Sequence, residues 1–312
     1  MPRSFLERLA AGDVMVSDGA TGTNYQSMGM EIGVAPEEWV FDRPANVLAL
    51  HRAFVEAGSD IILTCTFGGT RVRMRDNPYA DRAPELNRRA AALACEAAVQ
   101  RPGVFVAGSM GPTGMLCEPL GELTHADAVA TYAEQAAALT AGGVDFLLLE
   151  TFFALEEATA AIEGVKQASN LPLIVSFSYD QGTRTMMGLR PAQVVEAIAP
   201  LGAAAIGANC GKALDTMVTV LDEMLAARGG LPIWIKPNAG LPRMLGDVAA
   251  YDLMPEQMGE YAARFVRAGA QIVGGCCGSS PAHVAAIARA VKSASNATPL
   301  VSAVPSAAAP GR

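Results

Sequence analysis

The chain has 312 residues, of which 51% are hydrophobic and 17% charged, so it can bury one large core or two smaller ones. Its formal net charge of −8 and the lack of any Lys or Arg run argue against nucleic-acid binding, which needs a basic surface. The first residues lack the apolar core of a signal peptide, and no apolar run is long enough to cross a bilayer. We therefore expect a cytoplasmic protein, in which thiols stay reduced and clustered cysteines more often bind metal than form disulfides.

Short runs rich in Val, Ile and Leu recur along the chain and predict eight strands. These runs are residues 14–17, 60–64, 104–108, 144–149, 172–177, 204–207, 232–236 and 271–274. Alanine-rich segments with helical spacing lie between them, and they predict helices over 83–99, 126–141, 155–168, 192–199, 214–227 and 255–268. Eight such units in this length predict a single (β/α)8 TIM barrel of the α/β class, rather than an open doubly wound sheet.

The turn after the first strand reads Asp-Gly-Ala-Thr-Gly-Thr-Asn, which has too few correctly spaced glycines for a dinucleotide-binding loop. The long connection over residues 22–44 contains Trp39 and Phe41, and we expect it to be a loop folded over the barrel mouth. The barrel is predicted to occupy residues 1–292. Residues 293–312 are rich in Ser, Ala, Pro and Val and are expected to form a mobile tail, with no second domain.

Three cysteines fall where an apolar strand ends: Cys210 after the sixth strand, and Cys276 and Cys277 after the eighth. In a barrel the carboxyl ends of all strands meet at one mouth, so these thiols can converge. Three thiolates are a donor set suited to zinc, and they leave a fourth tetrahedral position for water or substrate, as catalytic sites do. The alternative is that the cysteines are small buried hydrophobic residues.

Other strand ends are polar as well. Glu150 follows a buried apolar strand, so its carboxylate needs a partner, and a substrate ammonium is one candidate. Asp18 follows the first strand and has the alternative role of capping the turn there. Lys236 follows the seventh strand and raises the alternative of a Schiff-base enzyme.

The remaining cysteines and histidines are poor candidates for ligands or bases. Cys65 lies at the predicted mouth, but a fourth thiolate would close the metal site to substrate. The others are expected in helices or loops away from the strand ends: Cys95, Cys117, His51, His125 and His283.

The predicted metal site favours one kind of chemistry. Zinc held by three thiolates carries a formal charge of −1 and is a weak electrophile for activating water. A substrate thiol at the open position loses its proton, because metal coordination deprotonates thiols. The thiolate stays electron-rich and can attack an alkyl carbon, so the site predicts alkyl transfer to a thiol.

Seven motifs of the chain resemble the homocysteine S-methyltransferase family. They are DGATGT at 18–23, TCTFG at 64–68, GSMGP at 108–112, LET at 149–151, GANC at 207–210, PNAG at 237–240 and GGCCG at 274–278. The family includes betaine-homocysteine methyltransferases, S-methylmethionine-dependent enzymes and the homocysteine module of cobalamin-dependent methionine synthase. The resemblance covers residues 12–292 and implies methyl transfer to homocysteine, giving methionine.

The resemblance also implies a zinc-bearing barrel with assigned residues. Cys210, Cys276 and Cys277 hold the metal, and the homocysteine thiolate is the fourth ligand. Asn238 matches the residue that can take the fourth position when homocysteine is absent. The implied substrate-binding residues are Asp18, Gly19, Thr66, Ser109 and Glu150.

The methyl donor is the open question. Vertebrate-type betaine enzymes have two aromatic residues where this chain has Phe67-Gly68, and a tryptophan near the place of Val34, so their cage for a quaternary ammonium is incomplete here. Another cage could be built from Tyr25, Trp39, Phe41 or Phe67.

Segments 184–188 and 258–261 are closer to short bacterial betaine-homocysteine methyltransferases, which favours betaine or a related onium donor. The alternative is a homocysteine-binding subunit that takes the methyl group from methylcobalamin on a separate corrinoid protein. A non-catalytic zinc-binding barrel is the third alternative. Selenohomocysteine and other thiols remain open as acceptors.

Overall fold

The computed structural model describes residues 3–245 and 248–296. Eight parallel strands form one sheet in the order β1-β10-β7-β6-β5-β4-β3-β2, and a parallel bridge between Ser17 and Ile61 joins its two ends. The strands are β1 Met15–Val16, β2 Ile61–Leu63, β3 Phe105–Met110, β4 Phe146–Phe152, β5 Leu173–Ser178, β6 Ala205–Cys210, β7 Ile233–Pro237 and β10 Ile272–Val273. All eight predicted strands are present, and the predicted (β/α)8 barrel is confirmed.

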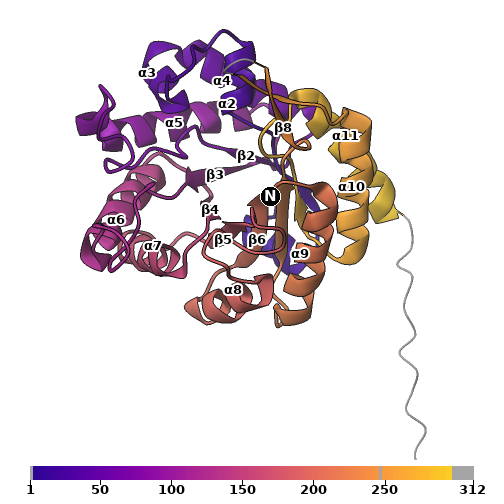
Figure 1. Cartoon of the computed structure of the whole chain (residues 1–312). Coiled ribbons are helices and arrows are strands. Elements are labelled where there is room, and N and C mark those ends of the chain that lie inside the picture. The colour runs from indigo at the N-terminus through magenta and orange to yellow at the C-terminus, as the bar shows by residue number, and fades with distance from the viewer. Residues whose placement is uncertain (1–2, 246–247, 297–312) are drawn as a thin grey trace, which may run out of the picture.

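A ring of helices surrounds the sheet (Figure 1). The helices are α1 Phe5–Ala10, α2 Gly22–Ser27, α3 Trp39–Asp42, α4 Pro44–Ala57, α5 Ala83–Ala98, α6 His125–Ala141, α7 Leu155–Ala168, α8 Pro191–Ile198, α9 Leu214–Ala227, α10 Pro255–Ala268 and α11 Pro281–Asn296. The six helices predicted between strands all lie within one residue of their predicted bounds. No helix in the described ranges is both long and apolar enough to cross a membrane.

The amino-terminal end of the barrel is packed by α1. Ser4 caps this helix, because its hydroxyl accepts a hydrogen bond from the Glu7 amide at 3.3 Å while the Glu7 carboxylate accepts from the Ser4 amide at 2.6 Å. The helix sets Phe5 against Phe146 from β4, with ring centroids 4.1 Å apart. Since this end is filled, the opposite end is left for a site.

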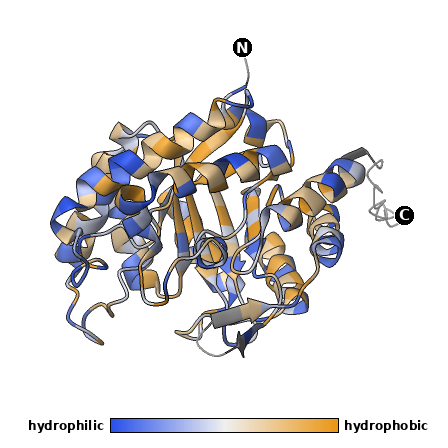
Figure 2. Ribbon diagram, turned by 90° about the horizontal axis from the view of Figure 1, so that it is seen from above, coloured by the Kyte–Doolittle hydropathy of each residue, from blue (hydrophilic) through white to orange (hydrophobic). Residues whose placement is uncertain are grey.

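Alternation along each strand divides its side chains between two cores. In β4, Phe146 and Leu148 point into the barrel, whereas Leu147 and Leu149 pack against the helices. Both sets are buried, which is why parallel strands appear in the sequence as continuous apolar runs. Figure 2 shows the apolar strands at the centre and the more hydrophilic helices around them.

The segment over residues 22–44 is largely helical, so the prediction of a loop was wrong. It forms α2, a 3-10 turn over Pro36–Glu38, and α3. Trp39 is 7% exposed and stacks on Tyr25 with ring centroids 4.8 Å apart, and this packing orders the segment. Pro36 and Glu37 line the barrel mouth, as expected for a segment that covers it.

The structure differs from the prediction in two features of the carboxyl-terminal part of the chain. An antiparallel hairpin, β8 Pro242–Leu245 with β9 Val248–Tyr251, follows β7. Helix α11 extends to Asn296, so the predicted tail from residue 293 begins inside this helix. Residues 297–312 of that tail lie outside the described residues.

Candidate active site

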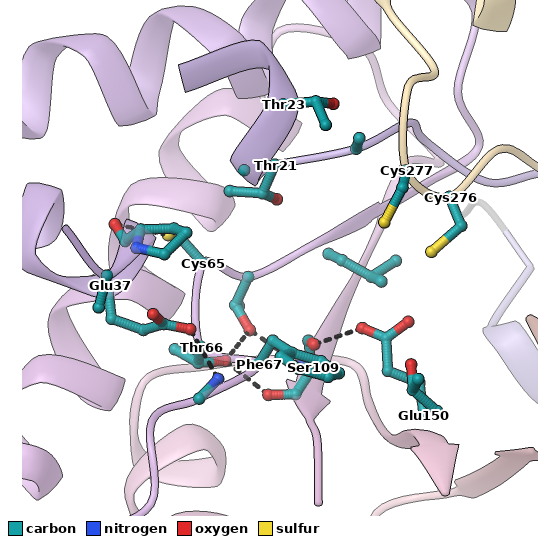
Figure 3. Close-up of a pocket in the computed structure, with 18 of the residues that line it drawn as sticks. Thr21, Thr23, Glu37, Cys65, Thr66, Phe67, Ser109, Glu150, Cys276 and Cys277 are labelled. Carbon is teal, nitrogen blue, oxygen red and sulfur yellow. Dashed lines mark hydrogen bonds between the residues drawn. The ribbon is translucent and has the colours of Figure 1, made fainter. Parts of the chain in front are cut away.

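A cavity of about 540 Å³ opens at the carboxyl ends of the strands. It is lined by residues at or after seven of the eight strands, together with parts of the 22–44 segment. Figure 3 shows Cys276 and Cys277 on one side of this cavity, with Ser109 and Glu150 facing them and Glu37 at the far side. None of the three histidines lines the cavity.

The three predicted cysteines meet at one wall of the cavity. Cys210 is the last residue of β6, and Cys276 and Cys277 follow β10. Their sulfur atoms all lie within 4.8 Å of one another, and Cys210 Sγ is 3.2 Å from Cys276 Sγ. In the part of the chain that the structure describes, no other group of three His, Cys, Asp or Glu side chains is arranged to hold a metal. Hydrogen bonds from Cys210 and Cys276 lower the pKa of Cys277, so the cluster favours a thiolate.

Asn238 connects the two cysteine-bearing loops. Its Nδ2 donates to the Gly211 carbonyl at 2.9 Å, and its Oδ1 accepts from the Cys277 amide at 3.0 Å. The side chain therefore fixes the backbone beside Cys210 and Cys277. It does not line the cavity, and its role as the fourth metal ligand stays a prediction.

The β8–β9 hairpin reaches the same wall. Gly278 has φ +81, and a Cβ at this position would lie 2.3 Å from the Tyr251 ring. Tyr251 thus packs directly on the backbone that follows Cys277. Burial raises the pKa of the Tyr251 phenol, and a hydrogen bond with the Cys277 thiol adds to this shift.

Glu150 and Ser109 form the facing wall. Glu150 is 5% exposed, and Ser109 Oγ donates to its Oε1 at 2.5 Å. Burial raises the pKa of Glu150 to about 7, although the nearby Lys236 opposes the shift. Burial disfavours the charged form of this carboxylate, and because the carboxylate lines a cavity, a cationic group of a ligand can compensate for its lost hydration.

Asp18 and Lys236 form a buried ion pair, with Lys236 Nζ 3.1 Å from Asp18 Oδ1. Burial disfavours the charged lysine, but Asp18 and Glu150 outweigh this effect and raise the pKa of Lys236. A lysine that stays protonated is a poor nucleophile, which argues against the Schiff-base alternative. The other Asp18 oxygen accepts from the Leu63 amide at 2.7 Å, and Asp18 does not line the cavity.

Gly19 and Thr66 lie beside these groups in the cavity wall. A Cβ on Gly19 would be 2.4 Å from the Ser279 carbonyl oxygen, so only glycine fits there. Thr66 Oγ1 donates to the Ser109 carbonyl at 2.7 Å, which supports the strand that carries Ser109. The direct roles of Asp18, Gly19, Thr66, Ser109 and Glu150 in substrate binding stay predictions.

The far side of the cavity holds a residue that sequence reasoning missed. Glu37 is 5% exposed, and its Oε1 accepts from the Gly68 amide at 2.6 Å. Phe67 is the one aromatic residue among those that line the cavity. Tyr25 and Trp39 stack on each other, and Arg82 lies over the Phe41 ring, so these three rings do not complete an aromatic cage.

The positions of Lys236 and Tyr251 in the site were also not predicted from the sequence. Lys236 stands at a strand end, which is a signal for a cavity residue, but its partner Asp18 is 218 residues away and only the closed barrel brings them together. Tyr251 carries no signal of its own, because its position depends on the hairpin.

Known proteins match this chain over most of its length. A methionine synthase from Mycobacterium tuberculosis is 32% identical over 294 residues, which cover 89% of this chain and 24% of that protein. One from Mycobacterium leprae is 31% identical over 309 residues, which cover 94% of this chain and 25% of that protein. The chain therefore spans about a quarter of the length of these curated relatives.

The fold has a counterpart among solved structures. The metallated form of the homocysteine methyltransferase MmuM from Escherichia coli superimposes with a TM-score of 0.77 at 22% identity, covering 91% of this chain and 98% of that chain. This likeness supports the barrel fold. The sequence itself matches the homocysteine S-methyltransferase description over residues 15–291, from the first barrel strand into the last helix. The chain belongs to the homocysteine S-methyltransferase family.

Proposed function

We propose that this protein transfers a methyl group to the sulfur of homocysteine and forms methionine, with zinc held by Cys210, Cys276 and Cys277. The observation that carries the proposal is the meeting of these three thiols opposite Glu150 in one cavity, in a chain of this family. Homocysteine has a thiol and an amino-acid ammonium group, so it needs the three cysteines at one end of the cavity and the Glu150 carboxylate at the other.

The donor set fits zinc, because thiolates are soft ligands and three of them leave one tetrahedral position open. Zinc bound there would supply acidification of the homocysteine thiol and would hold its sulfur as a thiolate. A metallated form of MmuM, which shares this fold, is in keeping with the proposal.

The protein's own residues orient the amino acid. Glu150 binds the substrate ammonium, and Ser109 orients the Glu150 carboxylate through its 2.5 Å hydrogen bond. Lys236 neutralises Asp18, so Glu150 is the carboxylate that remains for the substrate. Asn238 holds the Cys277 backbone while the sulfur chemistry takes place.

With an onium donor such as betaine, the carbon–nitrogen bond breaks and its electron pair stays on the nitrogen, giving dimethylglycine. The methyl carbon forms its new bond to the homocysteine sulfur, and the thiol proton is released to solvent. No oxidant or reductant is needed, because the methyl group moves as a cation equivalent between two nucleophiles.

Two kinds of compound are candidates for the methyl donor. Betaine or a related onium compound fits the size of the cavity, but Phe67 alone offers it an aromatic face. Methylcobalamin on a separate corrinoid protein is the second candidate. It is favoured by the missing cage and by relatives named methionine synthase that are about four times as long as this chain.

Methionine formation tests the function. Zinc-loaded protein is incubated with homocysteine and, in separate reactions, betaine, S-methylmethionine or methylcobalamin, and methionine is measured by mass spectrometry. We expect methionine from at least one donor, and none from the Cys276→Ala variant. Methionine from betaine alone would support the onium donor, whereas methionine only from methylcobalamin would support the corrinoid candidate. No methionine from any donor, with homocysteine bound by the protein, would contradict methyl transfer from all three.

A further inference from the structure

One side-chain amide touches both the metal end and the amino-acid end of the site. Asn209 precedes Cys210 in β6 and is fully buried. Its Oδ1 accepts hydrogen bonds from the Thr151 amide at 2.9 Å and from Ser176 Oγ at 2.7 Å. Its Nδ2 donates to Thr151 Oγ1 at 2.6 Å and points at two sulfur atoms, Cys210 Sγ at 3.6 Å and Cys276 Sγ at 4.0 Å.

The direction of this amide follows from its partners. The Thr151 backbone N–H can only donate, so the Asn209 atom that faces it must be the amide oxygen. That choice turns the nitrogen toward the sulfurs. Both lone pairs of Oδ1 and both hydrogens of Nδ2 then have partners, so the carboxamide uses its full capacity.

The two residues beside this amide have an unusual backbone. Thr151 has φ +67 and Cys210 has φ +58, and they are the non-glycine residues with positive φ in the described chain. A β-branched residue such as Thr rarely adopts this conformation, and strained positions of this kind persist only when neighbouring contacts hold them. Asn209 supplies two such contacts to Thr151 and is covalently joined to Cys210.

These strained residues lie next to the working groups. Thr151 follows Glu150, so the Asn209 contacts fix the peptide that carries the carboxylate. Cys210 and Cys276 are two of the three predicted metal ligands, and the amide hydrogen that Thr151 Oγ1 does not accept is directed at their sulfur atoms. Residues that hydrogen-bond to metal ligands fix the orientation of those ligands, and removing such residues commonly lowers metal affinity 10- to 100-fold.

We propose that Asn209 is a positioning residue that fixes the metal-binding thiols relative to Glu150, so that the metal end and the amino-acid end of the cavity are set by one amide. This inference rests on the proposed function, because it assigns homocysteine to the cavity. The proposal predicts that a substitution of Thr151 on β4 lowers the affinity for the metal, although β4 supplies none of the three predicted cysteine ligands.

Cobalt binding tests the proposal without turnover. Apo-protein is titrated with Co(II) against a competing chelator, and the sulfur-to-cobalt charge-transfer bands are recorded. Asn209→Asp keeps both accepted hydrogen bonds but removes the N–H donors to sulfur, and we expect its Co(II) affinity to fall at least tenfold with altered bands. Thr151→Ala removes the hydroxyl that holds the amide, and we expect a fall of about threefold or more.

The matched control is Ser178→Ala, a buried hydroxyl two residues beyond Ser176 in β5 that hydrogen-bonds Asp180 and not Asn209. Its Co(II) affinity should stay within twofold of the unsubstituted protein. Circular dichroism identifies any variant that has lost its fold, and Thr151→Ala then carries the test. Unchanged affinity and unchanged bands in the folded variants would overturn the proposal.

Homocysteine binding to zinc-loaded protein, measured by calorimetry, gives the second readout. Asn209→Asp and Thr151→Ala should each weaken homocysteine binding at least threefold, whereas Ser178→Ala should not. A loss of metal affinity with unchanged homocysteine affinity would mean that the two ends are not coupled, and would overturn the proposal. If the unsubstituted protein binds Co(II) but no homocysteine, the proposed function fails, and the Co(II) response of Thr151→Ala still decides whether Asn209 links β4 to the metal end.

Discussion

At the scale of single residues, the side of the cavity near Asp18, Lys236 and Glu150 is a balance of three buried ionisable groups. Asp18 and Lys236 form an ion pair with both side chains at most 4% exposed. Glu150 has Ser109 as its hydrogen-bond donor but no cation within ion-pair distance in the described ranges 3–245 and 248–296, and burial raises its pKa to about 7. Glu150 is therefore the acidic group whose charge can still be changed by a ligand.

The Glu150→Gln variant tests this assignment through pH. In the proposed binding mode, the unsubstituted protein has a Glu150 carboxylate for the substrate ammonium above pH 7, and a hydrogen bond between charged groups contributes about 1.5–3 kcal/mol. We expect the KM for homocysteine to rise about 10- to 100-fold in the variant at pH 8. Initial rates over a homocysteine series measure this ratio.

The same ratio should shrink toward one at pH 6, because a carboxyl with a pKa raised to about 7 is protonated there and resembles the amide of Gln. Comparing the two proteins at each pH cancels the titration of the substrate thiol. The sign for stability follows from the same shift. Between the ordinary carboxyl pKa and pH 7 the folded protein binds more protons than the unfolded chain, so this group lowers the free energy of unfolding as the pH rises through that range.

At the scale of elements, the β8–β9 hairpin packs against the cysteine cluster from outside the barrel. Its Tyr251 packs on Gly278, one residue after Cys277. The hairpin thus fixes the loop that carries two of the three thiols.

Gly278→Ala tests this contact. The new methyl group would lie 2.3 Å from the Tyr251 ring, at a backbone φ of +81 that alanine rarely adopts. The left-handed conformation alone costs about 1–2 kcal/mol, and the clash with the ring adds to it. We expect a lower free energy of unfolding in urea and a Zn(II) affinity at least tenfold weaker, measured by chelator competition.

The matched control is Gly188→Ala, at a glycine with the same φ of +81 but with no atom within 4 Å of a new Cβ. It should show the conformational cost with unchanged Zn(II) affinity. Equal Zn(II) affinity in both variants would mean that the Tyr251 contact does not support the cysteine loop.

Elements differ in how far the sequence predicts them. Helix α7 was predicted with its observed bounds, because 155–168 has a regular helical pattern. The apolar run 144–149 predicted strand β4, but the strand continues through the polar residues Glu150 and Thr151 to Phe152. The hairpin was missed, although the Gly246-Asp247 pair between two short runs is a turn signal. Helix α3 was missed because its four residues are held by Trp39 stacking on Tyr25, a contact that no local pattern encodes.

The site divides in the same way. The thiols of Cys210, Cys276 and Cys277 could be predicted to meet, since strand ends converge in any barrel of this kind. The pairing of Lys236 with Asp18 could not, because it depends on which side chains face each other across the closed ring. The failure of an aromatic cage to form was likewise a matter of packing between segments.

At the scale of the whole molecule, the barrel interior is the support for the mouth. Trp234 from β7 is fully buried inside it and packs on Gly207 of β6, where a Cβ would be 2.6 Å from the Trp234 Cβ. Gly207 and Trp234 are direct neighbours in the paired strands β6 and β7, so the large side chain on one strand is accommodated by a residue without a side chain on the other.

Trp234→Ala should lower the free energy of unfolding by about 3–5 kcal/mol, because it leaves a cavity that the surrounding strands cannot fill. Trp234→Phe should cost less, since it keeps an aromatic ring and removes an indole N–H that has no hydrogen-bond partner among the residues that the structure describes. Urea unfolding of the zinc-loaded proteins measures both. A larger loss in Trp234→Phe than in Trp234→Ala would contradict this view of the interior.

We propose that three thiols of this barrel hold zinc with one position for the sulfur of homocysteine. X-ray absorption at the zinc edge, on purified zinc-loaded protein with and without homocysteine, tests this coordination. We expect three sulfur neighbours in the absence of homocysteine and four in its presence, and fewer than three in the Cys276→Ala variant without homocysteine. A zinc environment that does not change when homocysteine is added, or that contains four protein ligands throughout, would contradict it.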